Sequence, residues 1–277
     1  MGKTPNKDQI QSYLNSYGMS PIRRLGQNFL IDDEIAKTIV SYLDISKQDI
    51  VAEIGPGFGA LTAHLCEHQA RLDLFEIDAK MCQFLADHYK DKSNVSIYHL
   101  DILKADLNPY TIIASNLPYY ATTAIIEKIY RQTPNIKRAV FMIQKDAYPR
   151  ISAFVGQEGY GPLSIMLGYI ADISVLIDVK PQSFFPAPPV DSLVIGMNFL
   201  PAIDWGFVMN LDRVVRHIFQ NRRKTILNNM SGLIASKEMA KQLLLELGIE
   251  PLYRPENITI KQYARLVDEI NSRRVAK

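Results

Sequence analysis

A glycine-rich segment at the end of an apolar run is the feature of this sequence that most clearly indicates chemistry. Residues 53–59 read Glu-Ile-Gly-Pro-Gly-Phe-Gly, and they continue the apolar run 50–54. Glycines between a strand and a helix permit a sharp turn and let a ligand approach the backbone closely. The third glycine comes too early for the dinucleotide fingerprint, and Glu53 disfavours a pyrophosphate but suits a cationic ligand. A tight turn that binds nothing is the alternative interpretation.

Two more acidic residues stand at the ends of the next two apolar runs. Glu76 follows the glycine loop by about 20 residues, where an acid binds ribose hydroxyls in such folds. Asp101 ends the run 95–100 and is placed to accept a hydrogen bond from the exocyclic amine of an adenine ring. Each acid alone is also explained as a helix N-cap or a surface residue. Together with Glu53 they favour an adenosine that carries a positive sulfonium, as in S-adenosylmethionine, over a phosphate-bearing cofactor.

Residues 116–119, which read Asn-Leu-Pro-Tyr, end a further apolar run. An amine attached to a purine is a poor nucleophile because its lone pair is delocalised into the ring. The Asn116 side-chain oxygen and a backbone carbonyl at Leu117 or Pro118 would accept hydrogen bonds from both N–H groups and favour a nucleophilic nitrogen. Tyr119 offers a face on which an extruded base stacks. The pattern therefore predicts methylation of an adenine amine, and a plain proline turn is the alternative.

Apolar runs of strand length alternate with segments of helical spacing through the first part of the chain. Such alternation predicts a parallel sheet covered by helices on both faces. The expected strands are 50–54, 72–77, 95–100, 111–115 and 138–143, and the expected helices around them are 32–43, 61–68, 80–89 and 124–130. The runs 173–179 and 193–198 lack a long helix between them, so we expect them to pair antiparallel at one edge.

The composition changes near residues 200–205, and beyond this point the sequence predicts helices alone. These expected helices cover residues 207–230, 237–247 and 260–272. We place a domain boundary here, between a catalytic domain of residues 1–203 and a helical domain of residues 204–277. Residues 1–20 are polar and poorly periodic, and we expect them to form a loosely held lead-in.

The composition is typical of a globular protein from the cytoplasm. Apolar residues make up 47% of the chain and charged residues 22%, and the formal net charge is +2. No apolar stretch reaches the roughly 20 residues of a membrane helix, and no signal-like run opens the chain. The two cysteines, Cys66 and Cys82, lack partners at metal-ligand spacing, so no metal is expected. Basic residues gather at 21–24, 222–224 and 273–277, where they could form a one-sided surface.

The order of these short motifs resembles that of the ribosomal RNA adenine dimethyltransferases, particularly the bacterial 16S rRNA (adenine-N6,N6) branch. The resemblance runs from about Leu25 to the last expected helix. It rests on the glycine loop, Glu76, Asp101 and residues 116–119, together with the segments 27–30, 141–145, 160–164, 184–192 and 219–225. The chain departs from the family after Tyr119, where Asn-Ile-Ser-Thr is usual and this sequence has Tyr-Ala-Thr-Thr.

The resemblance implies a Rossmann-like class I methyltransferase fold, with a mostly parallel seven-stranded sheet and a small all-helical C-terminal domain. It implies an S-adenosylmethionine pocket lined by Asn28, Leu30, Gly55, Glu76, Asp101 and Asn116. The target base would be held by Asn116 and Tyr119, and Phe184 would cover its other face. Arg222, Arg223 and Lys224, on a helix of the small domain, would contact RNA phosphates.

The family product is a pair of adjacent N6,N6-dimethyladenosines in the 3′-terminal hairpin of 16S rRNA, made on a pre-30S ribosomal particle. We expect a monomeric enzyme. Two alternatives remain: a 23S rRNA dimethyltransferase of the macrolide-resistance type, and a non-catalytic factor in small-subunit assembly. Phe58 in the glycine loop and the modest net charge favour the 16S branch over the first. The presence of Glu76, Asp101 and residues 116–119 favours catalysis over the second.

Overall fold

The computed structural model describes residues 2–21, 27–132, 134–201 and 203–275 of the 277-residue chain. Within these ranges the chain forms two compact units. One comprises residues 1–147 and 173–199, and the other comprises residues 148–172 and 200–277. Residues 148–172 thus pack with the helices that follow residue 200, although they precede the expected domain boundary. The division at residues 203 and 204 into a catalytic and an RNA-contacting domain stays a prediction.

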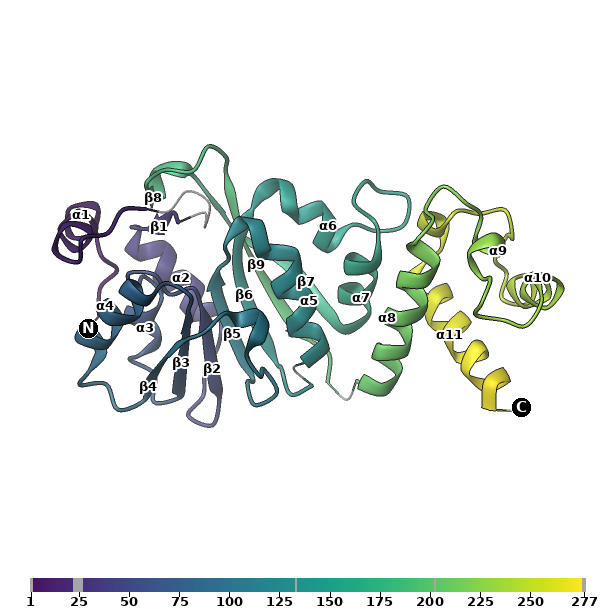
Figure 1. The fold of residues 1–277 in the computed structure, drawn as a ribbon, viewed down its shortest axis with the longest axis horizontal. Coiled ribbons are helices and arrows are strands. Elements are labelled where there is room, and N and C mark those ends of the chain that lie inside the picture. Colours follow the sequence, from purple (N-terminus) through teal and green to yellow (C-terminus); the bar gives the residue numbers. More distant parts are fainter. Residues whose placement is uncertain (1, 22–26, 133, 202, 276–277) are drawn as a thin grey trace. The chain divides into compact units, whose positions relative to one another are not determined.

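Among the described residues, seven strands form one sheet in the order β4-β3-β2-β5-β6-β9-β7 (Figure 1). These strands are β2 (Ile50–Ile54), β3 (Arg71–Glu76), β4 (Val95–His99), β5 (Ile112–Asn116), β6 (Arg138–Gln144), β7 (Ala171–Val179) and β9 (Ser192–Phe199). Strands β2 to β6 pair in parallel, and β9 runs antiparallel to β6. The predicted mostly parallel seven-stranded sheet is therefore confirmed, and its expected strand ends are correct to within two residues.

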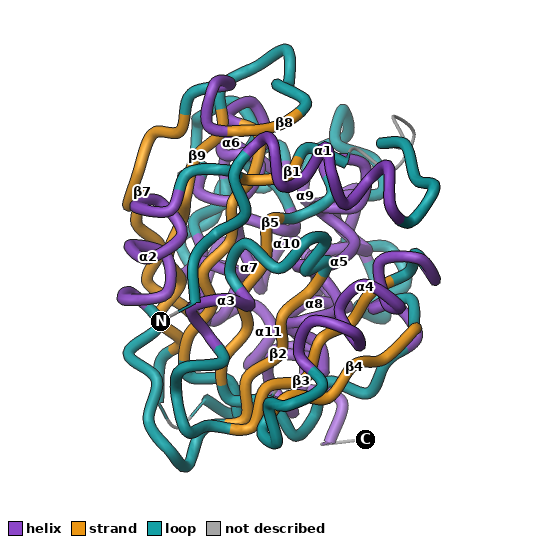
Figure 2. The backbone as a smooth tube through the Cα atoms, turned by 90° about the vertical axis from the view of Figure 1, so that its left-hand side faces the viewer, coloured by secondary structure: helices purple, strands orange, loops and turns teal. Residues whose placement is uncertain are grey.

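The register of the parallel strands brings their carboxyl ends to one edge of the sheet. Ile54 at the end of β2 lies opposite Phe75 on one side and Ser115 on the other. Glu76 lies opposite His99 at the end of β4. The central strands are buried on both faces, which explains their nearly continuous apolar sequences. The residues that follow these four strands consequently share one edge of the sheet, whose strands run side by side in Figure 2.

Short helices connect the strands of this unit. They are α2 (Asp33–Tyr42), α3 (Thr62–Leu65), α4 (Ala79–Tyr89) and α5 (Thr122–Gln132). Asp32 and Asp78 cap α2 and α4 by accepting hydrogen bonds from backbone N–H groups in the first turn. The helix expected over residues 61–68 is confined to the four residues of α3. A separate antiparallel pair joins β1 (Phe29–Leu30) to β8 (Phe184–Phe185), with Leu30 opposite Phe184.

The prediction of a loosely held N-terminal lead-in is wrong. Residues 7–16 form helix α1 (Lys7–Ser16), whose first turn is closed by a capping box between Asn6 and Gln9. Ile10 and Leu14, one turn apart, are buried in the same apolar core as the sheet. Tyr13 packs against Phe84 with ring centroids 4.7 Å apart. A narrow stripe of apolar and aromatic residues therefore docks a helix whose other positions are polar.

The second unit is helical, and one predicted helix is wrong in its extent. Its helices are α6 (Tyr148–Ser152), α7 (Pro162–Ile170), α8 (Trp205–Phe219), α9 (Ile226–Asn229), α10 (Lys237–Glu246) and α11 (Ile260–Val275). The single helix expected over residues 207–230 is divided into α8 and α9 by a turn. The Asn229 side chain donates hydrogen bonds to the carbonyls of Asn221 and Lys224, and Thr225 caps α9. These local side-chain bonds favour the turn over a continuous helix.

Candidate active site

The glycine loop turns the chain sharply at the end of β2. Gly55 has a φ of +64° and Gly59 a φ of +78°, both in the left-handed region that other residues rarely adopt. The Gly55 N–H donates to the Phe75 carbonyl at 2.9 Å, which fixes the loop to β3. A Cβ atom at Gly59 would lie 2.5 Å from the Tyr89 hydroxyl oxygen, whereas one at Gly55 would meet no atom within 4 Å. Gly55 thus presents open backbone at the sheet edge.

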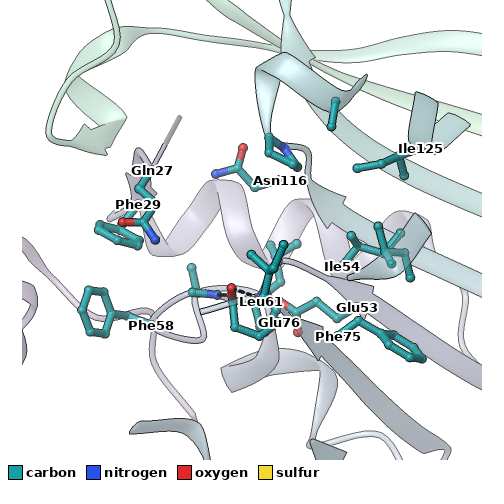
Figure 3. Close-up of a pocket in the computed structure, with 18 of the residues that line it drawn as sticks. Gln27, Phe29, Glu53, Ile54, Phe58, Leu61, Phe75, Glu76, Asn116 and Ile125 are labelled. Carbon is teal, nitrogen blue, oxygen red and sulfur yellow. Dashed lines mark hydrogen bonds between the residues drawn. The ribbon is translucent and has the colours of Figure 1, made fainter. Parts of the chain in front are cut away.

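A cavity of about 180 Å³ lies at this edge (Figure 3). All six residues that the sequence predicted for the cofactor line it: Asn28, Leu30, Gly55, Glu76, Asp101 and Asn116. Glu53 and the glycine loop also contribute to its wall. In Figure 3 Asn116 lies across the cavity from Glu53 and Glu76. The structure therefore brings these predicted residues together, and their binding of a cofactor stays a prediction.

Glu53 is a buried carboxyl group at the base of the glycine loop. Its side chain is 2% exposed, and it accepts a hydrogen bond from the Thr62 hydroxyl at 2.7 Å. Burial raises the pKa of Glu53 to about 8, and the negative charge of Glu76 adds to this while the Thr62 hydrogen bonds oppose it. A cationic group in the cavity would favour the ionised form of Glu53.

Glu76 ends β3 and holds the loops on both sides of it. One carboxylate oxygen accepts hydrogen bonds from the N–H groups of Ile77 at 2.8 Å and Asp78 at 3.0 Å. The other accepts from the Gly57 N–H at 3.2 Å. Burial raises the pKa of Glu76, and these three backbone hydrogen bonds counteract part of that rise. The carboxyl group is therefore oriented by the backbone at the wall of the cavity.

Asp101 caps a turn and also lines the cavity. Its Oδ1 atom accepts a hydrogen bond from the Leu103 N–H at 2.9 Å, which caps the short 3₁₀ turn of residues 102–104. The residue also lines the cavity, beside Ile102 and Leu103. A carboxylate has two acceptor oxygens, so capping the turn with one leaves the group able to accept a further hydrogen bond from a ligand.

Asn116 and Leu117 lie where β5 ends. The Asn116 side-chain amide donates to the Asn28 carbonyl at 3.0 Å, and the Leu117 N–H donates to the Met142 carbonyl at 3.0 Å. The Pro118 carbonyl already accepts the Ala121 N–H at 2.9 Å. Asn116 and Pro118 line the cavity, whereas Leu117 is buried and lies outside its wall.

Tyr119 and Phe184 lie outside the wall of the cavity. The Tyr119 hydroxyl is 3.1 Å from the Ser192 hydroxyl at the start of β9, and burial raises the pKa of Tyr119. Phe184 is 3% exposed and belongs to the apolar core, where β8 pairs with β1. Contacts of these two residues with the target base stay a prediction.

The position of three acidic residues, Asn116 and Pro118 around one cavity agrees with the sequence resemblance, and comparison with known proteins decides the family. The profile of the ribosomal RNA adenine dimethylase family matches residues 21–272. The chain belongs to this family. A Geobacillus kaustophilus relative, ribosomal RNA small subunit methyltransferase A, is 38% identical over 282 aligned residues, covering 95% of this chain and 94% of the relative. The Clostridium acetobutylicum protein of that name is 36% identical over 265, covering 93% and 96%.

Solved structures share the fold. A dimethyladenosine transferase from Plasmodium falciparum superposes with a TM-score of 0.77 at 24% identity, covering 88% of this chain and 97% of that one. The 23S rRNA methyltransferase ErmE superposes with a TM-score of 0.68 at 21% identity, covering 88% and 100%. At these identities the two likenesses establish the Rossmann-like methyltransferase fold.

Several cavity residues were not anticipated from the sequence. Pro5, from the N-terminal segment, and Ile77 and Leu103, which follow the two acidic strand ends, all line the cavity. Tyr120 also lines it and is 60% exposed. This is the position at which the chain departs from the usual Asn of the family, so the departure lies in the cavity wall. For Ile77 and Leu103 the signal was their place next to acidic residues, whereas nothing near Pro5 indicated a ligand site.

The basic residues predicted to bind RNA lie on the turn between α8 and α9, so their placement on a helix is wrong. Arg222 donates a hydrogen bond to the Tyr160 carbonyl at 2.9 Å and lies over the Phe219 ring at 5.5 Å. Arg223 and Lys224 are exposed. Of the other basic segments, Arg23, Arg24 and Lys277 lie outside the described residues.

In the described part of the chain, no helix has both the length and the apolar character needed to cross a membrane. In the same residues, no group of three or more His, Cys, Asp or Glu side chains is arranged to hold a metal ion.

Proposed function

We propose that this protein transfers methyl groups from S-adenosylmethionine to the N6 amines of two adjacent adenosines in the 3′-terminal hairpin of 16S rRNA. The observation that carries the proposal is one cavity lined by the glycine loop, Glu53, Glu76 and Asp101, with Asn116 across from Glu53 and Glu76 (Figure 3). Membership of the ribosomal RNA adenine dimethylase family supports the same reaction. The names of the 36–38% identical relatives support the small subunit as its place of action.

The chemistry of the cavity fits S-adenosylmethionine. Glu53 and Glu76 are buried carboxyl groups that favour a positive charge, and Gly55 presents open backbone beside them. In the proposed arrangement Glu76 accepts hydrogen bonds from the ribose hydroxyls and Asp101 accepts one from the adenine amine. Asn28, Leu30, Gly55 and Asn116 complete the pocket. When bound, the cofactor supplies an electrophilic methyl group.

The residues after β5 prepare the adenine amine to accept that methyl group. The Asn116 side-chain oxygen and a backbone carbonyl at Leu117 or Pro118 accept hydrogen bonds from the two N–H groups of the amine. The nitrogen then keeps its lone pair out of the ring, where it is nucleophilic. No tuned general base is needed, because the nitrogen is more acidic once methylated and its proton leaves afterwards. The Asn28 carbonyl orients Asn116 for this role by accepting from its amide group at 3.0 Å.

In the proposed complex the RNA is held by two aromatic residues and by the basic turn, which consists of residues 222–224. Tyr119 offers a stacking face to the extruded base, a contact that is worth about 1–3 kcal/mol in proteins that bind single strands. Phe184 covers the other face of the base, and this role requires its side chain to leave the core position described above. Arg223 and Lys224 neutralise phosphates, which positions the RNA without reading its sequence. Arg222 supports their turn.

The proposed substrate is the RNA within a pre-30S ribosomal particle, and the proposed enzyme is a cytoplasmic monomer. Relatives named for the small ribosomal subunit support the particle. The formal net charge of +2 is small for a protein that binds naked RNA by charge alone. A preformed particle, which holds the hairpin in place, compensates for such a weak general attraction.

Methylation of particles tests the proposal. Purified protein is incubated with methyl-labelled S-adenosylmethionine and 30S particles from a strain that lacks N6,N6-dimethyladenosine, and the RNA is digested and analysed by mass spectrometry. We expect two adjacent dimethyladenosines in the 3′-terminal fragment. Parallel reactions with 50S particles distinguish the proposed enzyme from a dimethyltransferase of the macrolide-resistance type, because the latter would label 23S rRNA. Binding to 30S particles without methyl transfer would identify a non-catalytic assembly factor.

A further inference from the structure

The N-terminal segment enters the wall of the cavity. Pro5 is buried and lines the cavity together with the glycine loop, although 48 residues separate it from Glu53. The proline ring fixes the φ angle of Pro5. The residues on either side of Pro5 therefore determine where its ring lies. Those neighbours are Asn6, the N-cap of α1, and Thr4, which is 2% exposed.

Thr4 is held at both its backbone and its side chain. Its N–H donates to Asp33 Oδ1 at 2.8 Å, and its hydroxyl donates to the Ala60 carbonyl at 3.1 Å. His64 Nε2 lies 3.2 Å from the Thr4 hydroxyl oxygen and 3.0 Å from Asp33 Oδ1. Burial works against the charged form of Asp33, but hydrogen bonds from Lys37 and Thr4 outweigh it and lower its pKa. Thr4 thus joins α2, α3 and the end of the glycine loop.

The hydroxyl of Thr4 connects two pieces of the cavity wall. Ala60, whose carbonyl it binds, lines the cavity, and so does Pro5, the next residue after Thr4. Gly2 is also packed closely on this side, because a Cβ there would lie 2.0 Å from the Ala63 carbonyl oxygen. On the other side of Pro5, helix α1 is docked by Ile10 and Leu14 in the core. Pro5 therefore lies between two segments that are fixed to the rest of the protein, Thr4 before it and helix α1 after it.

We propose that Thr4, with His64 and Asp33, is a positioning cluster that sets the Pro5 wall of the cofactor pocket. The inference rests on the proposed function, because it assumes that the cavity takes S-adenosylmethionine. Loosening the cluster widens the pocket and costs cofactor affinity. The carbonyls and side chains after β5, which act on the adenine amine, are untouched by it. The cluster consequently affects the binding of one substrate and leaves the chemical step intact.

The test compares three variants. Thr4→Val keeps the shape of the side chain and removes the hydroxyl, Thr4→Ser restores the hydroxyl, and Tyr17→Phe removes a bond at the far end of α1. Tyr17 donates to Asp87 at 2.8 Å, so its variant also loses one hydrogen bond of the N-terminal segment and serves as the matched control. Calorimetric titration with S-adenosylmethionine gives affinity, and methylation of 30S particles gives kcat and both KM values.

We expect Thr4→Val to weaken cofactor binding by about three- to tenfold and to raise the KM for S-adenosylmethionine equally. Its kcat and its KM for particles should stay within about twofold of wild type, as should all values for Thr4→Ser and Tyr17→Phe. Unchanged affinity in a folded Thr4→Val protein would overturn the inference. Equal losses in Thr4→Val and Tyr17→Phe would do so too, because they would indicate general loosening. Wild-type protein that binds no S-adenosylmethionine would instead overturn the proposed function, and this inference with it.

Hydrogen exchange supplies a readout if Thr4→Val does not fold. Coupling between two sites is reciprocal, so cofactor binding to wild-type protein should protect the amides of Thr4 and Asn6. The amides near Tyr17 should exchange at the same rate with and without cofactor. Absence of any change at Thr4 and Asn6 in saturated wild-type protein would contradict the inference.

Discussion

The side-chain amide of Asn116 donates a hydrogen bond to the main-chain carbonyl of Asn28, 3.0 Å away and 88 residues earlier in the chain. The bond ties the end of β5 to the segment that leads into β1, and both residues line the cavity. It also decides which half of the Asn116 amide faces a substrate. With the nitrogen engaged by Asn28, the oxygen is the atom that accepts from the adenine amine in the proposed reaction.

Removing the side-chain oxygen of Asn116 should reduce methyl transfer more than it reduces the affinity for S-adenosylmethionine. We expect Asn116→Ala to lose on the order of 100-fold in single-turnover methylation, as when one preorganised hydrogen-bonding group is removed from an active site. Its affinity for S-adenosylmethionine, measured by calorimetry, should fall by less than about tenfold. Asn116→Asp keeps an acceptor but cannot donate to Asn28, so it should lie between Asn116→Ala and wild type. Near-normal dimethylation by Asn116→Ala would contradict the assigned role.

Glu76 should govern affinity for the cofactor. Replacing it by Ala removes the proposed acceptor for the ribose hydroxyls, and we expect calorimetric affinity for S-adenosylmethionine to fall by about tenfold or more. The same change frees three backbone N–H groups that Glu76 binds, at Gly57, Ile77 and Asp78. Glu76→Gln, which keeps one acceptor oxygen, separates the two effects and should lose less. Unchanged affinity in Glu76→Ala would remove this residue from the site.

The raised pKa of Glu53 predicts a pH dependence of stability. Burial raises this pKa from 4.5 to about 8, so between these values the folded protein holds a proton that the unfolded chain has released. The contribution of Glu53 to the free energy of unfolding is therefore fully present below about pH 4.5 and is lost as the pH rises through 8. Denaturant titrations of the cofactor-free protein at several pH values measure it. Glu53→Gln should flatten the profile in this window.

Cofactor binding should couple to the same proton. A positive sulfonium in the cavity favours ionised Glu53, so binding below about pH 8 should release a proton and affinity should increase with pH up to that point. Calorimetry in two buffers with different ionisation enthalpies detects the released proton. Glu53→Gln, in which the group cannot ionise, is the control. Equal proton release by wild type and Glu53→Gln would assign the proton to another group, and Glu76 would then be the candidate.

Patterns local in sequence predicted the sheet and much of the site. Each central strand is an apolar run because it is buried on both faces, and residues after such runs must meet at the carboxyl edge. Glu76, Asp101 and Asn116 were therefore predictable from position alone. Pro5 was not, because its place in the cavity depends on Thr4 contacts with Asp33 and Ala60, which are 29 and 56 residues away.

Two errors in the predicted helices are explained by the sequence around each helix. Helix α1 was missed because Ile10 and Leu14 are separated by polar residues, and tyrosines complete the buried stripe that docks it. The break between α8 and α9 was missed because no Pro or Gly marks it. It depends on Asn229, which binds carbonyls of the turn from five and eight residues further along the chain.

That break changes the expectation for the basic turn. A helix would spread three consecutive basic side chains around its axis. On the turn all three are exposed, and Arg222 in addition contacts Tyr160 and Phe219. We therefore expect different consequences for the three residues. Arg222→Ala should lower the free energy of unfolding by about 1 kcal/mol, as is usual for one lost hydrogen bond. Arg223→Ala and Lys224→Ala should leave stability unchanged.

Binding to 30S particles, unlike stability, should depend on Arg223 and Lys224 rather than on Arg222. Arg223→Ala and Lys224→Ala should each weaken particle binding and make its dependence on salt shallower, by up to about one unit of slope per lost phosphate contact. Affinity for S-adenosylmethionine should stay at the wild-type value, because a phosphate contact in the helical unit does not alter the cavity. Filter binding at several salt concentrations measures the slope. If the Arg223→Ala, Lys224→Ala double variant keeps both particle affinity and slope, these side chains are solvated surface charges and the RNA is held elsewhere.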